Sequence, residues 1–172
     1  MWFKSIDTVN PLELFLKKRS ENFTKKDIIK FVEKNNIQIL NFRYTAYDGR
    51  LKTLNFPITG KEYLNTILTS GERVDGSSLF PFVEAESSDL YVMPRFSTAY
   101  LDPFSAIPTL GLLCSYFGAD GKPLESSPEY TLKKAVQDFE TSTGYQFEAM
   151  GELEFYIVSG SGKLFNAENQ NG

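Results

Sequence analysis

A short turn between two strand-like segments is the feature that most constrains the fold of this chain. Residues 37–44 and residues 51–56 alternate apolar and polar side chains well enough to form strands. The dipeptide Asp48-Gly49 between them is a strong signal for a tight turn, and Pro57 ends the second segment. We therefore predict an antiparallel β-hairpin in this part of the chain.

Two helices are predicted before the hairpin, and both have clear start signals. Asn10 is placed to cap a short helix over residues 11–19, with Pro11 at the first helical position. Thr24 is placed to cap the next helix, with Asp27 three residues later as in a capping box. The apolar side of this second helix consists of Ile28, Ile29, Phe31 and Val32. We expect the first helix to dock on its own domain.

The rest of the chain is predicted to contain two groups of elements. The first group is a helix and two strands, over residues 61–68, 90–93 and 109–117. Together with the hairpin and the helices before it, this order is typical of a small α+β domain. The second group is a helix over residues 129–141, followed by a long strand over residues 146–158. Because one helix and one strand cannot bury both faces of a new sheet, we expect this second unit to be incomplete.

These elements divide the chain into three expected parts. Residues 1–21 form a helical extension, residues 22–117 form the α+β domain, and residues 118–172 begin a second domain that stops partway. The last residues are polar and glycine-rich, which indicates a loop that leads onward.

Charge and residue content exclude several classes of function. The 172 residues include 18 Lys and Arg against 22 Asp and Glu, so the formal net charge is −4, and no long basic run occurs. This argues against nucleic acid or a membrane surface as a partner. The sequence has no histidine, which excludes Ser-His and Cys-His nucleophile pairs and any histidine-containing metal site within this chain.

The single cysteine, Cys114, lies in an apolar run, so we expect a buried, reduced thiol. No stretch resembles a signal peptide, and none is long and apolar enough to span a bilayer. These features fit a cytoplasmic setting.

Two carboxylates lie two residues apart in the predicted last strand. Because alternate side chains of a strand point to the same face, we expect Glu152 and Glu154 to lie side by side. Like charges this close repel unless a cation compensates, and hard oxygen ligands suit Mg²⁺ or Mn²⁺. The alternative is a strand with one solvated face, and the spacing alone does not decide between the two.

Several short motifs occur in a fixed order along the chain. The most specific is Val74-Asp75-Gly76-Ser77-Ser78, and it is followed by Glu86-Ser87-Ser88-Asp89-Leu90-Tyr91-Val92-Met93-Pro94, Thr98-Ala99, Asp102-Pro103-Phe104 and Gly151-Glu152-Leu153-Glu154-Phe155. Each motif alone is weak, because Asp-Gly-Ser is a turn wherever it occurs. In this order and with these separations, they resemble the N-terminal part of glutamine synthetase over about residues 22–158.

The resemblance implies a fold and an activity. In that family the first portion is a β-grasp domain, and the helix and strand after it begin the larger catalytic domain. The family joins glutamate and ammonia with ATP through a γ-glutamyl phosphate, in a homo-oligomeric ring whose active sites lie between subunits. The resemblance therefore implies small-molecule substrates, Mg²⁺ or Mn²⁺ as cofactor, and ATP as co-substrate at a site mostly outside this chain.

The resemblance also implies roles for four residues. Asp75 matches the aspartate that helps to bind and deprotonate ammonium in the site of a neighbouring subunit, and Ser78 matches a loop residue beside it. Glu152 and Glu154 match ligands of two different divalent metals, one at the glutamate carboxylate and one at the phosphates. The alternative for Asp75 is a turn residue or a helix cap.

Two departures from the family pattern affect the prediction. The family usually has an acidic residue where this chain has Arg95, a reversal that indicates a changed subunit contact or a divergent member acting on another amine. The later metal ligands, the nucleotide-binding segment and the substrate arginines belong to regions beyond Gly172, so this chain alone is expected to be inactive. The alternatives are a stand-alone truncated paralogue that acts as an interaction module, and a related γ-glutamyl-amine ligase.

Overall fold

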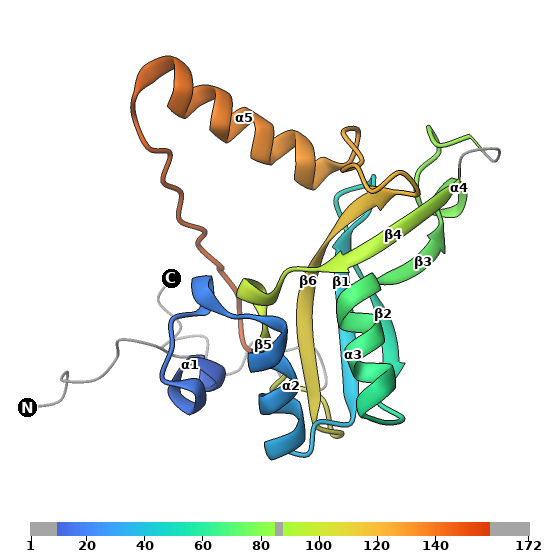
Figure 1. Cartoon of the computed structure of the whole chain (residues 1–172). Helices are drawn as coiled ribbons and strands as arrows, with labels where there is room; N and C mark the ends of the chain where they lie inside the picture. The colour runs from blue at the N-terminus through green and yellow to red at the C-terminus, as the bar shows by residue number, and fades with distance from the viewer. Residues whose placement is uncertain (1–9, 85–87, 159–172) are drawn as a thin grey trace, which may run out of the picture. The chain divides into compact units, whose positions relative to one another are not determined.

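The computed structural model in Figure 1 describes residues 10–84 and 88–158 of the chain. The chain divides into two compact units, Met1–Ala135 and Val136–Gly172. The first unit contains a β-sheet with helices, which confirms the predicted α+β class. None of the helices in the described ranges has the length and apolar character that crossing a bilayer requires.

The sheet of the first unit is mixed, and its main strands lie in the order β2-β1-β6-β4-β3. The strands are β1 (Ile39–Thr45), β2 (Leu51–Pro57), β3 (Glu72–Asp75), β4 (Asp89–Pro94), β5 (Tyr100–Leu101) and β6 (Thr109–Gly118). The predicted hairpin is confirmed, because β1 and β2 pair antiparallel with Thr45 opposite Leu51 at the turn. Strand β6 runs parallel to β1 and antiparallel to β4, and β3 pairs with the other edge of β4.

The described helices begin and end at residues that explain their bounds. They are α1 (Pro11–Leu16), α2 (Lys25–Lys34), α3 (Lys61–Ser70), α4 (Gly76–Leu79) and α5 (Pro128–Thr143). The predicted caps are confirmed: the Asn10 side chain accepts a hydrogen bond from the Leu12 N–H at 3.0 Å, and Thr24 and Asp27 form a capping box. Helix α1 ends earlier than predicted, because Lys17 adopts a left-handed conformation with φ of 52°.

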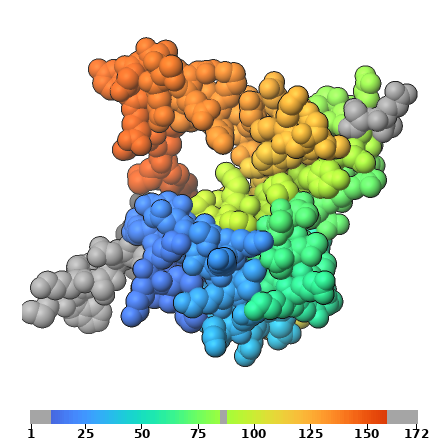
Figure 2. Space-filling model, viewed as in Figure 1, coloured from blue at the N-terminus to red at the C-terminus, as the bar shows by residue number. Residues whose placement is uncertain are grey.

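The apolar core lies between one face of the sheet and helices α2 and α3 (Figure 1). Strand alternation decides which side chains face it: Leu90 and Val92 on β4 are buried, whereas Tyr91 and Met93 lie on the opposite face. Helix α2 packs against both α1 and α3, and residues of the three helices form one continuous surface in Figure 2. Cys114 is buried as predicted, and burial raises the pKa of its thiol to about 12.

The sequence pattern did not predict β3, α4 or β5. All three are short: β3 and α4 have four residues each and β5 has two. A four-residue edge strand and a single helical turn are too short for periodicity to show. Strand β3 is placed by its pairing with β4, and β5 by its pairing with β6, so neither is fixed by its own sequence alone.

The prediction of a strand over residues 146–158 was wrong, because the structure assigns none of residues 145–157 to a strand. The apolar side chains of this segment are exposed: Met150 is 85% exposed, Leu153 is 87% exposed and Phe155 is 74% exposed. A strand is held by backbone hydrogen bonds to a neighbouring strand, and an alternating side-chain pattern does not supply that neighbour. The alternating pattern indicated a local preference for strand conformation, but these residues form no strand in the structure.

The preceding helix is confirmed, although its apolar side is not buried. Helix α5 covers the predicted span and ends before Gly144, whose φ of 72° suits a helix C-terminus. None of its described residues is buried, and Leu132 is 66% exposed and Phe139 40% exposed. The helix therefore presents apolar surface to solvent in this chain.

Candidate functional site

Asp75 lies where the edge strand β3 turns into the short helix α4. Its carboxylate accepts three hydrogen bonds from its own loop: from the Ser77 N–H at 3.0 Å, from Ser77 Oγ at 2.7 Å and from Ser78 Oγ at 2.7 Å. The Asp75 side chain is therefore the cap of α4, which is the alternative reading that the sequence left open. The structure brings Asp75 and Ser78, the two predicted catalytic residues, into direct contact.

Gly76 allows this loop to lie close against β4. Its N–H donates a hydrogen bond to the carbonyl oxygen of Ser88 at 2.6 Å. A Cβ at position 76 would lie 2.6 Å from Cδ1 of Leu90 and 2.9 Å from the Ser88 carbonyl oxygen. Because glycine has no side chain, the loop can lie this close to β4, and this close approach determines where Asp75 lies.

The hydrogen bonds keep Asp75 ionised. The side-chain hydrogen bonds from Ser77 and Ser78, in that order of importance, lower the pKa of Asp75 from 3.8 to about 2. The residue is exposed, so the negative charge faces solvent. The Asp75 carboxylate is therefore an exposed negative charge that attracts a small cation. Its low pKa also makes it a weak proton acceptor.

The sequence did not identify Ser77 as important for this loop. It is the largest contributor to the pKa of Asp75, through its hydroxyl and its backbone N–H. A serine two residues after an aspartate is a frequent turn partner, and this spacing is the signal that could have found it.

Glu152 and Glu154 lie in the segment that forms no strand, so the predicted side-by-side arrangement on a strand is absent. Both residues are exposed. Within residues 10–84 and 88–158, no three or more His, Cys, Asp or Glu side chains come together as a group that could hold a metal ion. Two carboxylates supply too few ligands for the near-octahedral set that Mg²⁺ requires, so the described residues do not form a complete metal site.

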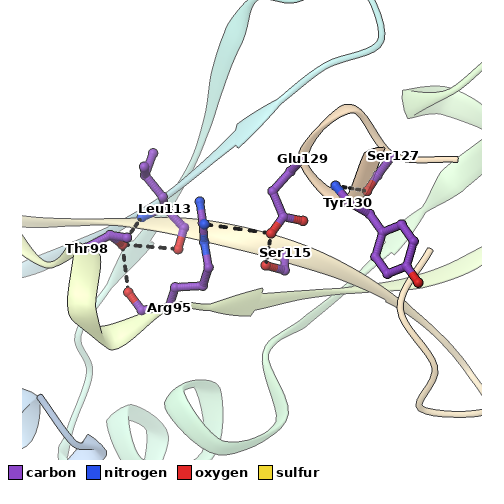
Figure 3. Close-up of polar contacts among 7 residues, drawn as sticks. All are labelled: Arg95, Thr98, Leu113, Ser115, Ser127, Glu129 and Tyr130. Carbon is purple, nitrogen blue, oxygen red and sulfur yellow. Dashed lines mark hydrogen bonds and ion pairs between the residues drawn. The ribbon is translucent and has the colours of Figure 1, made fainter. Parts of the chain in front are cut away.

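A second polar cluster joins the end of β4 to the start of α5 (Figure 3). Ser115 Oγ donates a hydrogen bond to Glu129 Oε1 at 2.8 Å, and Arg95 Nη1 lies 3.7 Å from the same oxygen. The backbone of Arg95 is fixed by its N–H, which donates to the Leu113 carbonyl oxygen at 2.8 Å, and by Thr98. The sequence singled out Arg95 as unusual but gave no signal for its partner Glu129.

Comparison with known proteins identifies relatives named glutamine synthetase. Residues 36–119 match the family described as glutamine synthetase, beta-grasp domain. A glutamine synthetase of Staphylococcus aureus (strain Mu50) is 32% identical over 137 residues, which are 78% of this chain and 30% of that protein. A glutamine synthetase of Staphylococcus epidermidis (strain ATCC 35984) is 33% identical over 138 residues, which are 79% of this chain and 30% of that protein. The chain thus spans about 30% of the length of the curated relatives that it matches.

Solved structures show the same fold at lower sequence identity. A cryo-EM structure of Plasmodium falciparum glutamine synthetase matches 70% of this chain and 23% of its own chain, with a TM-score of 0.60 and 21% identity. A structure titled "Apo GmaS without ligand" matches 68% of this chain and 27% of its own, with a TM-score of 0.59 and 14% identity. These likenesses support the fold of the first unit.

Proposed function

We propose that this chain, whose residues 36–119 belong to the glutamine synthetase β-grasp domain family, is the N-terminal part of a glutamate–ammonia ligase. In this proposal the ligase joins glutamate and ammonia with ATP, through a γ-glutamyl phosphate, in a homo-oligomeric ring. The curated relatives named glutamine synthetase support the proposal, with 32% and 33% identity over most of the chain. The observation that carries it is the Asp75 loop.

In the proposed mechanism, Asp75 attracts ammonium to the active site of a neighbouring subunit. Three hydrogen bonds from its own loop keep the carboxylate ionised and hold it in place, and the side chain is open to solvent. An ionised carboxylate binds a small cation by charge. With a pKa of about 2 in this chain, Asp75 accepts the ammonium proton only after the assembled site raises that pKa.

Ser78 positions Asp75 within this proposal. Its hydroxyl donates to Oδ2 of Asp75, whereas Ser77 donates to Oδ1. The two serines therefore hold the two carboxylate oxygens separately and fix the plane of the carboxylate. When the plane of the carboxylate is fixed, its two oxygens keep one orientation. A fixed orientation suits the binding of a small ion across a subunit interface.

We also propose that Glu152 and Glu154 become metal ligands when further residues complete the site. Bound Mg²⁺ or Mn²⁺ would neutralise phosphate charge during transfer from ATP. The described residues do not form that site by themselves, so synthesis of glutamine requires protein segments other than this chain. In this chain the two glutamates contribute negative charge on an exposed segment.

A chimaera tests the proposed function. Residues 22–158 replace the matching part of the Staphylococcus aureus enzyme, and ATP-dependent formation of glutamine is measured for the chimaera and for the 172-residue chain alone. We expect activity in the chimaera and none in the chain alone. A chimaera that assembles to the size of the parent oligomer but forms no glutamine would contradict the proposal, and so would activity of the isolated chain.

A further inference from the structure

A pocket of about 720 Å³ lies on the sheet face opposite the apolar core. It is formed by β4, by β6, by the turn that follows β6 and by the first two turns of α5. All of its lining residues belong to the first unit. This volume lies within the range of about 300–1,000 Å³ that is common for small-molecule sites.

Cross-strand pairs form the apolar floor of the pocket. Tyr91 lies opposite Phe117 and Met93 lies opposite Ser115 in the antiparallel ladder of β4 and β6. These residues share the face opposite Leu90 and Val92 because strand side chains alternate. Two rings and a thioether side by side provide a flat apolar surface that suits a ring or a branched aliphatic group.

The polar side of the pocket contains two cations and one carboxylate. Arg95 comes from the end of β4, and Glu129 and Lys133 lie one turn apart on α5. Oε1 of Glu129 already accepts a hydrogen bond from Ser115, and its distance of 3.7 Å from Arg95 Nη1 exceeds hydrogen-bond length (Figure 3). The three charges sum to a net positive charge in the pocket.

The guanidinium of Arg95 also has a donor without an acceptor. Its Nε atom is buried and has no hydrogen-bond partner among the residues that the structure describes. A buried N–H without an acceptor is unfavourable, and an arginine binds a carboxylate side-on through Nε and a terminal nitrogen. The Arg95 side chain as a whole is 40% exposed, so a carboxylate in the pocket meets its terminal nitrogens, and side-on binding requires the side chain to turn so that Nε leaves its buried position.

We propose that this pocket binds a small monocarboxylate with a flat apolar body. The carboxylate lies against Arg95, with Lys133 adding positive charge, and the apolar body lies on Tyr91 and Phe117. The net positive charge favours one negative charge on the ligand, and the apolar floor disfavours a fully polar anion such as inorganic phosphate. This site is separate from the Asp75 loop: Asp75 pairs with Asp89 at the first residue of β4, whereas Arg95 follows its last residue.

Nuclear magnetic resonance titration of the ¹⁵N-labelled 172-residue chain tests the proposal. The probe is 3-phenylpropionate, and its controls are the uncharged 3-phenylpropanamide and inorganic phosphate. We expect 3-phenylpropionate to cause saturable shifts at the amides of Tyr91, Ser115 and Phe117, with at least about tenfold weaker binding of both controls. Equal binding of the acid and the amide would overturn the proposal, as would shifts confined to the exposed segment 145–158.

Three variants assign the effect to the pocket. Arg95→Gln should weaken binding of 3-phenylpropionate about tenfold, because the charge-assisted hydrogen bonds are lost. Lys133→Gln changes an exposed residue and should weaken binding about threefold through charge alone. Lys122→Gln removes a nearby cation that does not line the pocket and should leave binding unchanged. Unchanged affinity in both Arg95→Gln and Lys133→Gln would overturn the proposal, even if one of them were less stable.

Discussion

The hydroxyl of Ser78 lies 2.7 Å from Oδ2 of Asp75 and donates a hydrogen bond to it. Ser77 makes the equivalent contact with Oδ1, also at 2.7 Å. The carboxylate is thus held at both oxygens by residues two and three positions further along the chain. This local arrangement gives the loop a fixed anion at the protein surface.

The first prediction concerns the ionisation of Asp75. Ser77→Ala and Ser78→Ala each remove a hydrogen bond to the charged form, so each should raise the pKa of Asp75 from about 2 toward its ordinary value of 3.8, with the larger effect for Ser77→Ala. Carboxyl ¹³C shifts recorded against pH measure this directly. Asp120, whose pKa is lowered by its own hydrogen bonds with Lys122, is the internal control and should not change. A pKa of Asp75 that is the same in both variants and the parent would refute the role of the serines.

The second prediction concerns the close approach of the loop to β4. Gly76→Ala places a Cβ 2.9 Å from the Ser88 carbonyl oxygen, so the backbone must move, and the free energy of unfolding should fall by about 1–3 kcal/mol. Urea denaturation followed by circular dichroism measures the change. Gly60→Ala is the matched control, because a Cβ at position 60 has no atom within 4 Å. Equal stability of the two variants would contradict the tight fit at Gly76.

The third prediction concerns acid unfolding through Asp27 in the capping box. Burial raises the pKa of this carboxyl, but hydrogen bonds from Lys18 and Thr24 outweigh that effect and lower the pKa to about 2. A lowered folded-state pKa means that Asp27 stabilises the fold above its unfolded pKa, near 3.8, and that this contribution is lost as the pH falls toward 2.

Asp27→Asn should therefore lower the free energy of unfolding by about 1–2 kcal/mol at pH 7 and by much less near pH 2. Thermal unfolding at the two pH values measures the difference. Glu21→Gln, at an exposed position nearby, is the control and should have little effect at either pH. A loss of stability in Asp27→Asn that is the same at both pH values would show that charge is not the cause.

The fourth prediction concerns the contact between Arg95 and the first turn of α5. Arg95→Asp places a second carboxylate near Glu129, which already accepts a hydrogen bond from Ser115. Like-charge repulsion should destabilise the first turns of α5 at pH 7. Hydrogen exchange at the amides of residues 131–135 measures this, with Arg95→Gln as the uncharged control. Faster exchange that is equal in the two variants would exclude repulsion as the cause.

The sequence predicted the parts of the fold that depend on local signals. The Asn10 cap, the capping box of Thr24 and Asp27 and the Asp48-Gly49 turn each involve residues within a few positions of one another, and each is present in the structure. The prediction of a strand over residues 146–158 was wrong. A strand depends on a partner strand, and alternation of apolar and polar side chains does not reveal whether one is present.

The same distinction holds for the candidate site. The motif predicted that Asp75 and Ser78 belong together, and their contact is local, because they are three positions apart in the sequence. The link between Arg95 and Glu129 joins residues 34 positions apart and depends on where α5 begins relative to β4, so no sequence pattern indicated it. The roles of Glu152 and Glu154 as metal ligands remain predictions that rest on the family resemblance.

The central claim is that Asp75 serves an active site completed by a neighbouring subunit, and mixed oligomers test it most directly. In the chimaera with the Staphylococcus aureus enzyme, pure Asp75→Ala and pure Glu154→Gln oligomers should each form almost no glutamine. After subunit exchange at equal amounts, some interfaces combine an intact Asp75 from one subunit with an intact Glu154 from the other. Activity should then recover to about a quarter of the parent value, as random pairing around a ring predicts. If mass measurements confirm exchange and the mixture forms no glutamine, Asp75 does not act across the interface, and the account is wrong.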